Sequence, residues 1–222
     1  MEVSISLNPA GRDLEKYLNQ MNAVLLSINE GRLGFHIDVL DGKLTDGEYK
    51  LVATEAMLPI DVHLSIAKPH ERIDDYLNAV CRVRYGRCVR SITFRVESLS
   101  KFDAKRLIKK IQKAGFKAGI AIGPGTYVGA DDYKELVEVS DVVLVMAAGG
   151  GKTSQVSNAA AIRKVQAVKK HNPGVRIILE GDINLDSIKR IKSAGVDTVV
   201  VDDCVYQAKD RRAAVLELIR AV

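Results

Sequence analysis

The stretch GFHIDVLDGK at residues 34–43 carries a histidine and an aspartate two positions apart, near the end of a short apolar segment. In a β-strand, residues i and i+2 point to the same face, so His36 and Asp38 would lie side by side. Such a pair has two interpretations: a buried His–Asp hydrogen bond, or half of a metal site. The pair alone does not distinguish them.

Two further residues have the chemistry to complete a metal site. His63 lies in the apolar segment 60–66, and Glu180 closes the apolar segment 175–180. An unpaired buried carboxylate is costly, so Glu180 is expected to have a partner. Two imidazoles and two carboxylates suit zinc, iron or manganese better than magnesium or calcium. For His63 alone, a hydrogen-bonded core histidine is the competing interpretation.

The order of the segments predicts a fold that could bring these residues together. β-branched apolar runs, expected to be strands, lie at 3–6, 34–39, 60–66, 89–94, 117–122, 141–146, 175–180 and 197–202. Segments with helical periodicity lie at 13–31, about 48–58, 71–84, 102–115, 130–140, 158–171, 184–195 and 209–221. The strands are continuous apolar runs, as parallel strands covered by helices are.

Eight strand–helix units, with no linker dividing them, predict one α/β domain over residues 1–222. A (β/α)8 TIM barrel is the expected architecture, and a doubly wound open sheet is the alternative. Active sites of such barrels lie at the carboxyl ends of the strands. His36, Asp38, His63 and Glu180 are therefore expected to converge on one mouth of the barrel.

The composition of the chain indicates which classes of molecule the protein is expected to bind. The 222 residues carry a net charge of +5, but only 5% are aromatic, which leaves little stacking surface for nucleic acid. No apolar run approaches the ~20 residues of a membrane span. The first residues have no signal-peptide pattern, and the three cysteines have no metal-type spacing. We expect a cytoplasmic protein with a small-molecule substrate and neither a nucleic-acid nor a membrane partner.

Five motifs together resemble the ribulose-phosphate 3-epimerase family over nearly the whole chain. They occur in the family's order, near its spacing: HIDVLDG (36–42), DVHLSIAKP (61–69), ITFRVES (92–98), KAGIAIGPGT (117–126) and DVVLVM (141–146). The resemblance implies 3-epimerisation of a ketose phosphate of the ribulose 5-phosphate/xylulose 5-phosphate type. It also implies a homo-oligomer.

The same resemblance implies roles for the four residues. His36, Asp38, His63 and Glu180 would hold a divalent metal, zinc, iron or manganese, which stabilises an enediolate. Asp38 and Glu180 would also act as acid and base on opposite faces of the sugar, since a single base would return the proton to the face it left. Ser6 and Met146 align with family residues near the substrate and the metal.

The sequence departs from the family pattern where the family binds phosphate. Aspartates enter the loops after the last two strands, a lysine enters the loop after segment 141–146, and Arg95 replaces a histidine. Like charge would repel a phosphate dianion unless those aspartates point away. The candidate substrate-binding residues are Ser6, Arg95, Met146, Gly151, Lys152, Thr153, Ser154, Gly181, Asp182, Asp202 and Asp203.

Two alternatives to the family's reaction remain open. One is an epimerase or isomerase of a different or unphosphorylated sugar, because the phosphate-binding loops are altered. The other is a non-catalytic barrel that binds a ligand. A nucleotide-binding P-loop is excluded at GGGKTS (149–154), because the position of its first glycine is occupied by Met146.

Overall fold

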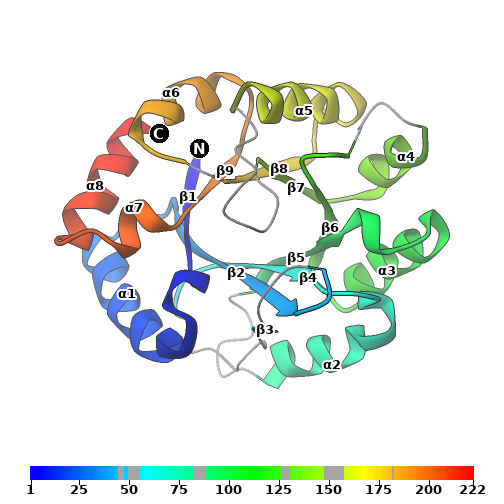
Figure 1. Ribbon diagram of the computed structural model, residues 1–222, viewed down its shortest axis with the longest axis horizontal. Helices are drawn as coiled ribbons and strands as arrows, with labels where there is room; N and C mark the ends of the chain where they lie inside the picture. Colours follow the sequence, from blue (N-terminus) through cyan, green and yellow to red (C-terminus); the bar gives the residue numbers. More distant parts are fainter. Residues whose placement is uncertain (45–47, 50–55, 83–88, 127–130, 148–157, 182) are drawn as a thin grey trace.

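Eight parallel strands close into a barrel in the computed structural model, which describes residues 1–44, 48–49, 56–82, 89–126, 131–147, 158–181 and 183–222 (Figure 1). The barrel strands are β1 (Glu2–Ser6), β2 (Leu33–Asp41), β4 (Ile60–Ser65), β5 (Val89–Arg95), β6 (Lys117–Ile122), β7 (Val142–Met146), β8 (Arg176–Glu180) and β9 (Thr198–Val201). Closure is complete because β1 pairs in parallel with β2 on one side and with β9 on the other. The predicted (β/α)8 barrel is confirmed.

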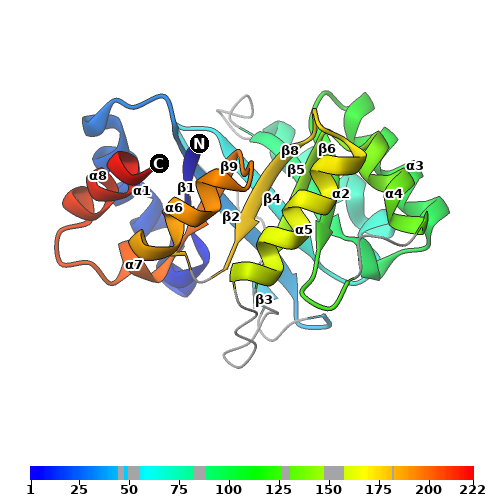
Figure 2. The ribbon, with the colours of Figure 1, turned by 90° about the horizontal axis from the view of Figure 1, so that it is seen from above.

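Helices form an outer ring around these strands, as Figure 1 shows along one axis and Figure 2 from above. They are α1 (Leu14–Ile28), α2 (Pro69–Arg82), α3 (Lys101–Lys113), α4 (Asp131–Val139), α5 (Asn158–His171), α6 (Leu185–Ser193), α7 (Asp203–Tyr206) and α8 (Arg211–Ala221). Short 3₁₀ helices, η1 (Asn8–Asp13) and η3 (Val96–Ser98), follow β1 and β5. No helix in the described ranges is long and apolar enough to cross a bilayer.

The prediction of a helix at about 48–58 is wrong where the structure describes that segment. Glu48–Tyr49 forms strand β3, which pairs antiparallel with the end of β2. Residues 56–59 are not helical, and 50–55 lie outside the described residues. A short isolated helix is only marginally stable in water, and here pairing with the end of β2 overrides the local helical periodicity. The last barrel strand, β9, is followed by two helices, α7 and α8, where the sequence predicted one.

An apolar layer fills the middle of the barrel. It is a separate buried cluster from the larger core between strands and helices, and it consists of Ala121, Val142, Leu144, Met146, Ile178 and Val200. These residues alternate along their strands with residues of the outer core, as the two-residue period of a strand requires. The interior face of β6 to β9 is therefore largely apolar between the two ends of the barrel, whereas β1 and β5 contribute the buried polar residues Ser4 and Thr93 midway along their length.

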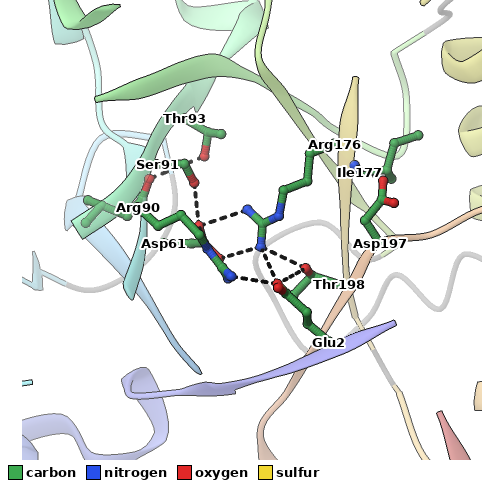
Figure 3. Close-up of polar contacts among 10 residues, drawn as sticks. Glu2, Asp61, Arg90, Ser91, Thr93, Arg176, Ile177, Asp197 and Thr198 are labelled. Atoms are coloured by element: carbon green, nitrogen blue, oxygen red, sulfur yellow. Dashed lines mark hydrogen bonds and ion pairs between the residues drawn. The ribbon is translucent and has the colours of Figure 1, made fainter. Parts of the chain in front are cut away.

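The amino-terminal end of the barrel is closed by a network of ion pairs (Figure 3). Asp61, whose side chain is 2% exposed, accepts hydrogen bonds from Arg90 (2.5 and 3.1 Å) and from both terminal nitrogens of Arg176 (3.0 and 3.1 Å). Ser91 donates a further bond of 2.5 Å, and Glu2 pairs with both arginines at 2.6 and 3.1 Å. Burial alone would raise the pKa of Asp61, but the two arginines outweigh it and hold that pKa well below its usual range.

Removing the central carboxylate should destabilise the fold strongly. We expect Asp61→Asn to lower the free energy of unfolding by about 3–5 kcal/mol, because it removes the buried carboxylate that both half-buried arginines share and leaves them only Glu2. The matched control is Asp74→Asn, which breaks the exposed Lys110 pair and should cost less than about 1 kcal/mol. Urea unfolding of both variants measures the difference. Equal small losses would contradict a structural role for the network.

The same carboxylate predicts a pH dependence. Its folded-state pKa is depressed, so its stabilisation is complete above the unfolded pKa of about 3.9 and is lost as the pH falls further. The gap in unfolding free energy between the native protein and Asp61→Asn should therefore shrink between about pH 4 and pH 2. A gap that stays constant through this range would contradict the assignment.

Candidate metal centre

Four side chains from three strands meet at the opposite, carboxyl end of the barrel. His36 and Asp38 come from β2, His63 from β4 and Glu180 from the last position of β8. Parallel pairing puts Asp38 directly opposite His63. Each of the four residues offers one possible ligand atom, and these atoms all lie within 4.8 Å of one another. The convergence expected from the sequence is thus present in the geometry.

The Asp38 carboxylate lies at the centre of this group. Its Oδ1 is 2.9 Å from His63 Nδ1 and 3.2 Å from His36 Nε2, and His36 Nε2 is 3.8 Å from Glu180 Oε2. Both imidazoles are buried, whereas the side chains of Asp38 and Glu180 are 18% and 24% exposed. The histidines therefore form the floor of the cluster, and the carboxylates face the opening of the barrel.

This arrangement fits a divalent metal. Ligands held about 2.0–2.2 Å from a tetrahedral ion lie roughly 3.3–3.6 Å from one another, and the observed separations bracket that value. Glu180 Oε2 is buried and has no hydrogen-bond partner among the residues that the structure describes. An orphaned buried carboxylate oxygen is costly, and a cation between the four ligand atoms would supply its missing partner. A set of two imidazoles and two carboxylates suits zinc, iron or manganese.

The electrostatics of the cluster are dominated by burial and by Asp38. Burial and the Asp38 charge raise the pKa of Glu180 to about 8. Burial alone would lower the pKa of His36, but the hydrogen bond to Asp38 and its charge raise it to about 9. Burial keeps the pKa of His63 below its usual value. Burial alone would raise the pKa of Asp38, but its hydrogen bonds to His36 and His63 outweigh burial and hold that pKa well below the usual range. A cation entering at neutral pH would displace protons from His36 and Glu180.

Asn8 positions the central aspartate, a role that the sequence analysis missed. Its side-chain amide donates to the Asp38 carbonyl (2.9 Å), and its amide oxygen accepts from the Asp38 backbone N–H (2.8 Å). These two hydrogen bonds fix the backbone of β2 at Asp38, the residue that provides the ligand side chain. The Asn-Pro dipeptide predicts a turn, but nothing in the sequence indicates a partner 30 residues away.

Of the other predicted site residues, Ser6, Met146, Arg95 and Gly181 lie at strand ends around the same mouth. Ser6 pairs in register with His36, and Met146 with Glu180; both side chains are buried. Arg95 ends β5. Gly181 follows Glu180 with φ of 147°, and a Cβ there would lie 2.6 Å from the Ala147 Cβ, so only glycine fits.

Asp202 and Asp203, the two acidic residues after β9, differ in burial. Asp202 is half-buried and accepts a hydrogen bond from the Asp203 backbone N–H at the start of α7. Its charge is among the smaller influences that raise the pKa of Glu180, which puts it near the cluster. Asp203 is exposed. Gly151, Lys152, Thr153, Ser154 and Asp182 lie outside the described residues.

Comparison with known proteins identifies related sequences. Residues 2–206 match the model of the ribulose-phosphate 3 epimerase family. The chloroplastic ribulose-5-phosphate-3-epimerase of Arabidopsis thaliana is 28% identical, covering 96% of this chain and 75% of its own. The ribulose-phosphate 3-epimerase of Mycobacterium tuberculosis (strain H37Rv) is 32% identical over 83% of this chain and 80% of its own. That of Aquifex aeolicus is 29% identical over 82% of each.

Solved structures share the architecture at low sequence identity. A 3-hexulose-6-phosphate synthase superposes with a TM-score of 0.64 at 13% identity, covering all of both chains. The tryptophan synthase A-subunit of Pyrococcus furiosus superposes with a TM-score of 0.65 at 16% identity, covering all of this chain and 95% of that one. These similarities concern the barrel fold alone.

Loss of one floor histidine should abolish tight metal binding. We expect His63→Gln to weaken zinc or manganese binding by at least about 100-fold, because it removes a buried ligand atom from the cluster. His171→Gln, at the end of α5, is the matched control and should bind as the native protein does. Isothermal titration calorimetry measures both, with circular dichroism to verify folding. Native affinity in a folded His63→Gln protein would contradict the site.

Proposed function

The chain belongs to the ribulose-phosphate 3-epimerase family, and we propose that it inverts C3 of a ketose phosphate, of the ribulose 5-phosphate type, by proton transfer between two carboxyl groups. The observation that supports this most directly is the convergence of His36, Asp38, His63 and Glu180 at the carboxyl end of the barrel. The curated relatives carry the name of this activity.

Asp38 and Glu180 are the proposed acid–base pair. They project from β2 and β8, which β1 and β9 separate around the barrel, and their nearest ligand oxygens lie within 4.8 Å. One carboxylate removes the C3 proton of the substrate, and the other carboxyl group donates a proton to the opposite face of the resulting enediolate. The two groups exchange roles in the reverse reaction. Two groups are needed because a single base returns its proton to the face from which it came.

The remaining residues position this pair. Both buried imidazoles contact Asp38 Oδ1, and Asn8 clamps its backbone, so the carboxylate has little freedom to leave its place. A divalent metal held by the four ligands would act as a Lewis acid and stabilise the negative charge that develops on the substrate. Ser6 and Met146, in register with His36 and Glu180, are proposed to line the substrate site.

A second candidate is the same proton transfer on an unphosphorylated or otherwise different sugar. Asp202 near Glu180 and the exposed Asp203 add negative charge to the rim after β9. Negative charge at this rim disfavours a phosphate dianion there and suits sugar hydroxyls, which can donate hydrogen bonds to carboxylates. A barrel that only binds its ligand would be recognised by metal binding without turnover of any ketose.

Glu180→Gln tests the acid–base assignment. The amide keeps the size of the side chain but neither removes nor donates the proton, so we expect kcat for epimerisation to fall by at least about 10³-fold. Glu138→Gln, at an exposed position of α4, is the matched control and should retain native kcat. Epimerisation of ribulose 5-phosphate is followed by NMR in metal-loaded protein. Full activity of Glu180→Gln would contradict the mechanism.

A further inference from the structure

Arg95 is the last residue of β5, and its side chain points into the mouth of the barrel. Along β5, Ser91 and Arg95 lie on one face because side chains alternate. Ser91 faces the barrel interior, where it donates to Asp61 (2.5 Å). Arg95 therefore faces the interior too, at the end of the strand where the metal centre lies. Its charge is among the smaller influences that lower the pKa of Glu180 and of His63.

A dedicated set of contacts orients this guanidinium. Arg95 Nε donates to Glu97 Oε2 at 3.0 Å. The other Glu97 oxygen accepts from the Gly123 backbone N–H (2.9 Å) and from the Thr126 hydroxyl, while Lys164 holds the same loop through the Gly123 and Pro124 carbonyls. Glu97 is thereby fixed before any ligand arrives. A cation held in this way loses little conformational entropy when it binds an anion.

Glycine at position 123 makes room for the pair. A Cβ there would lie 2.9 Å from Glu97 Oε1 and 3.0 Å from Arg95 Nη2, closer than side-chain carbons approach. The β6 rim beside Arg95 is therefore free of side chain at this point. The segment GPGT (123–126) thus supports a charged group at the mouth, through the hydrogen bonds from Gly123 and Thr126 to Glu97.

The outer nitrogens of Arg95 have unused donors. The guanidinium hydrogen-bonds only through Nε among the contacts of the described residues, although the side chain is just 17% exposed. Arginine carries four further N–H groups on Nη1 and Nη2, arranged to bind two oxygens of one phosphate or carboxylate. An oriented, largely buried arginine with free donors is complementary to such a group.

We propose that Arg95 binds the phosphate group of the substrate, so that the anionic end of the ketose phosphate lies on the β5–β6 side of the mouth. Asp38, Glu180 and Asp202 come from β2, β8 and the residue after β9, and their carboxyl groups repel an anion there. The Glu97 carboxylate beside Arg95 is already hydrogen-bonded by Arg95, Gly123 and Thr126. The identity of the substrate rests on the proposed function. The location of the anion rests on the contacts of Arg95.

Kinetics with two substrates tests this proposal. Arg95→Gln should lower kcat/KM for ribulose 5-phosphate about 10- to 100-fold, chiefly through KM, because charge-assisted hydrogen bonds to the phosphate are lost. It should lower kcat/KM for unphosphorylated ribulose much less, because that substrate has no phosphate contact to lose and only the electrostatic effect of Arg95 on the cluster is removed. Arg106→Gln on α3 makes the same charge change away from the mouth and should alter neither value. An equal loss on both ketoses, or no loss on either, would overturn the proposal.

Binding of inorganic phosphate separates this inference from the proposed function. Calorimetry on zinc-loaded protein should detect phosphate binding in the native and Arg106→Gln proteins, and its loss in Arg95→Gln. Arg95→Lys, which keeps the charge but not the planar fork, should bind with intermediate affinity and serves if the glutamine variant is unfolded. Arg95-dependent binding without turnover of any ketose would support this inference and contradict the proposed function. Native phosphate binding by a folded Arg95→Gln protein with normal turnover would contradict this inference and support the proposed function.

Discussion

Closure of the sheet by the parallel pairing of β1 with β2 and β9 is the constraint on which the rest of the structure depends. Once the sheet is closed, every second residue of each strand points into one confined space. On β4 the interior residues are Asp61, His63 and Ser65, and on β8 they are Arg176, Ile178 and Glu180. Each of these strands thus contributes a polar residue to the amino-terminal network and another to the mouth. On β8 the two are separated by Ile178 of the apolar cluster, whereas on β4 they are consecutive interior residues.

The two ends of the barrel differ in how their buried carboxyl groups are hydrogen-bonded. At the amino-terminal end the Asp61 carboxylate is saturated by Arg90, Arg176 and Ser91. At the mouth, no described residue forms a hydrogen bond with Glu180 Oε2, and burial and the Asp38 charge raise the pKa of Glu180 to about 8. A saturated network stabilises the fold and offers nothing to a ligand. Unsatisfied groups at the open end are where a cation and a substrate can be bound, in keeping with the division of stability and chemistry in this fold.

Much of the fold could be predicted from the sequence because parallel strands are continuous apolar runs. The eight predicted barrel strands lie within two residues of the observed ones at each end, and the positions of His36, His63 and Glu180 near strand ends were sufficient to predict their convergence. What could not be predicted depends on contacts between distant residues. Arg176 binds Glu2 from 174 residues away, and Asn8 binds Asp38 from 30. Strand periodicity indicates the face on which a side chain lies, but not the side chain that it meets there. The incorrect prediction of a helix at about 48–58 has the same cause, because the local sequence does not indicate that Glu48–Tyr49 pairs with β2.

In the proposed reaction, two different carboxyl groups remove and replace the proton at C3. The most direct test is the reaction of ribulose 5-phosphate with metal-loaded protein in D2O, followed by proton NMR at early times. A proton removed by one group and a deuteron supplied by the other predict product that carries deuterium at C3, while the remaining substrate still carries protium. Product that retains the substrate's own proton at C3 would mean that one group carries the proton across, and would contradict the account.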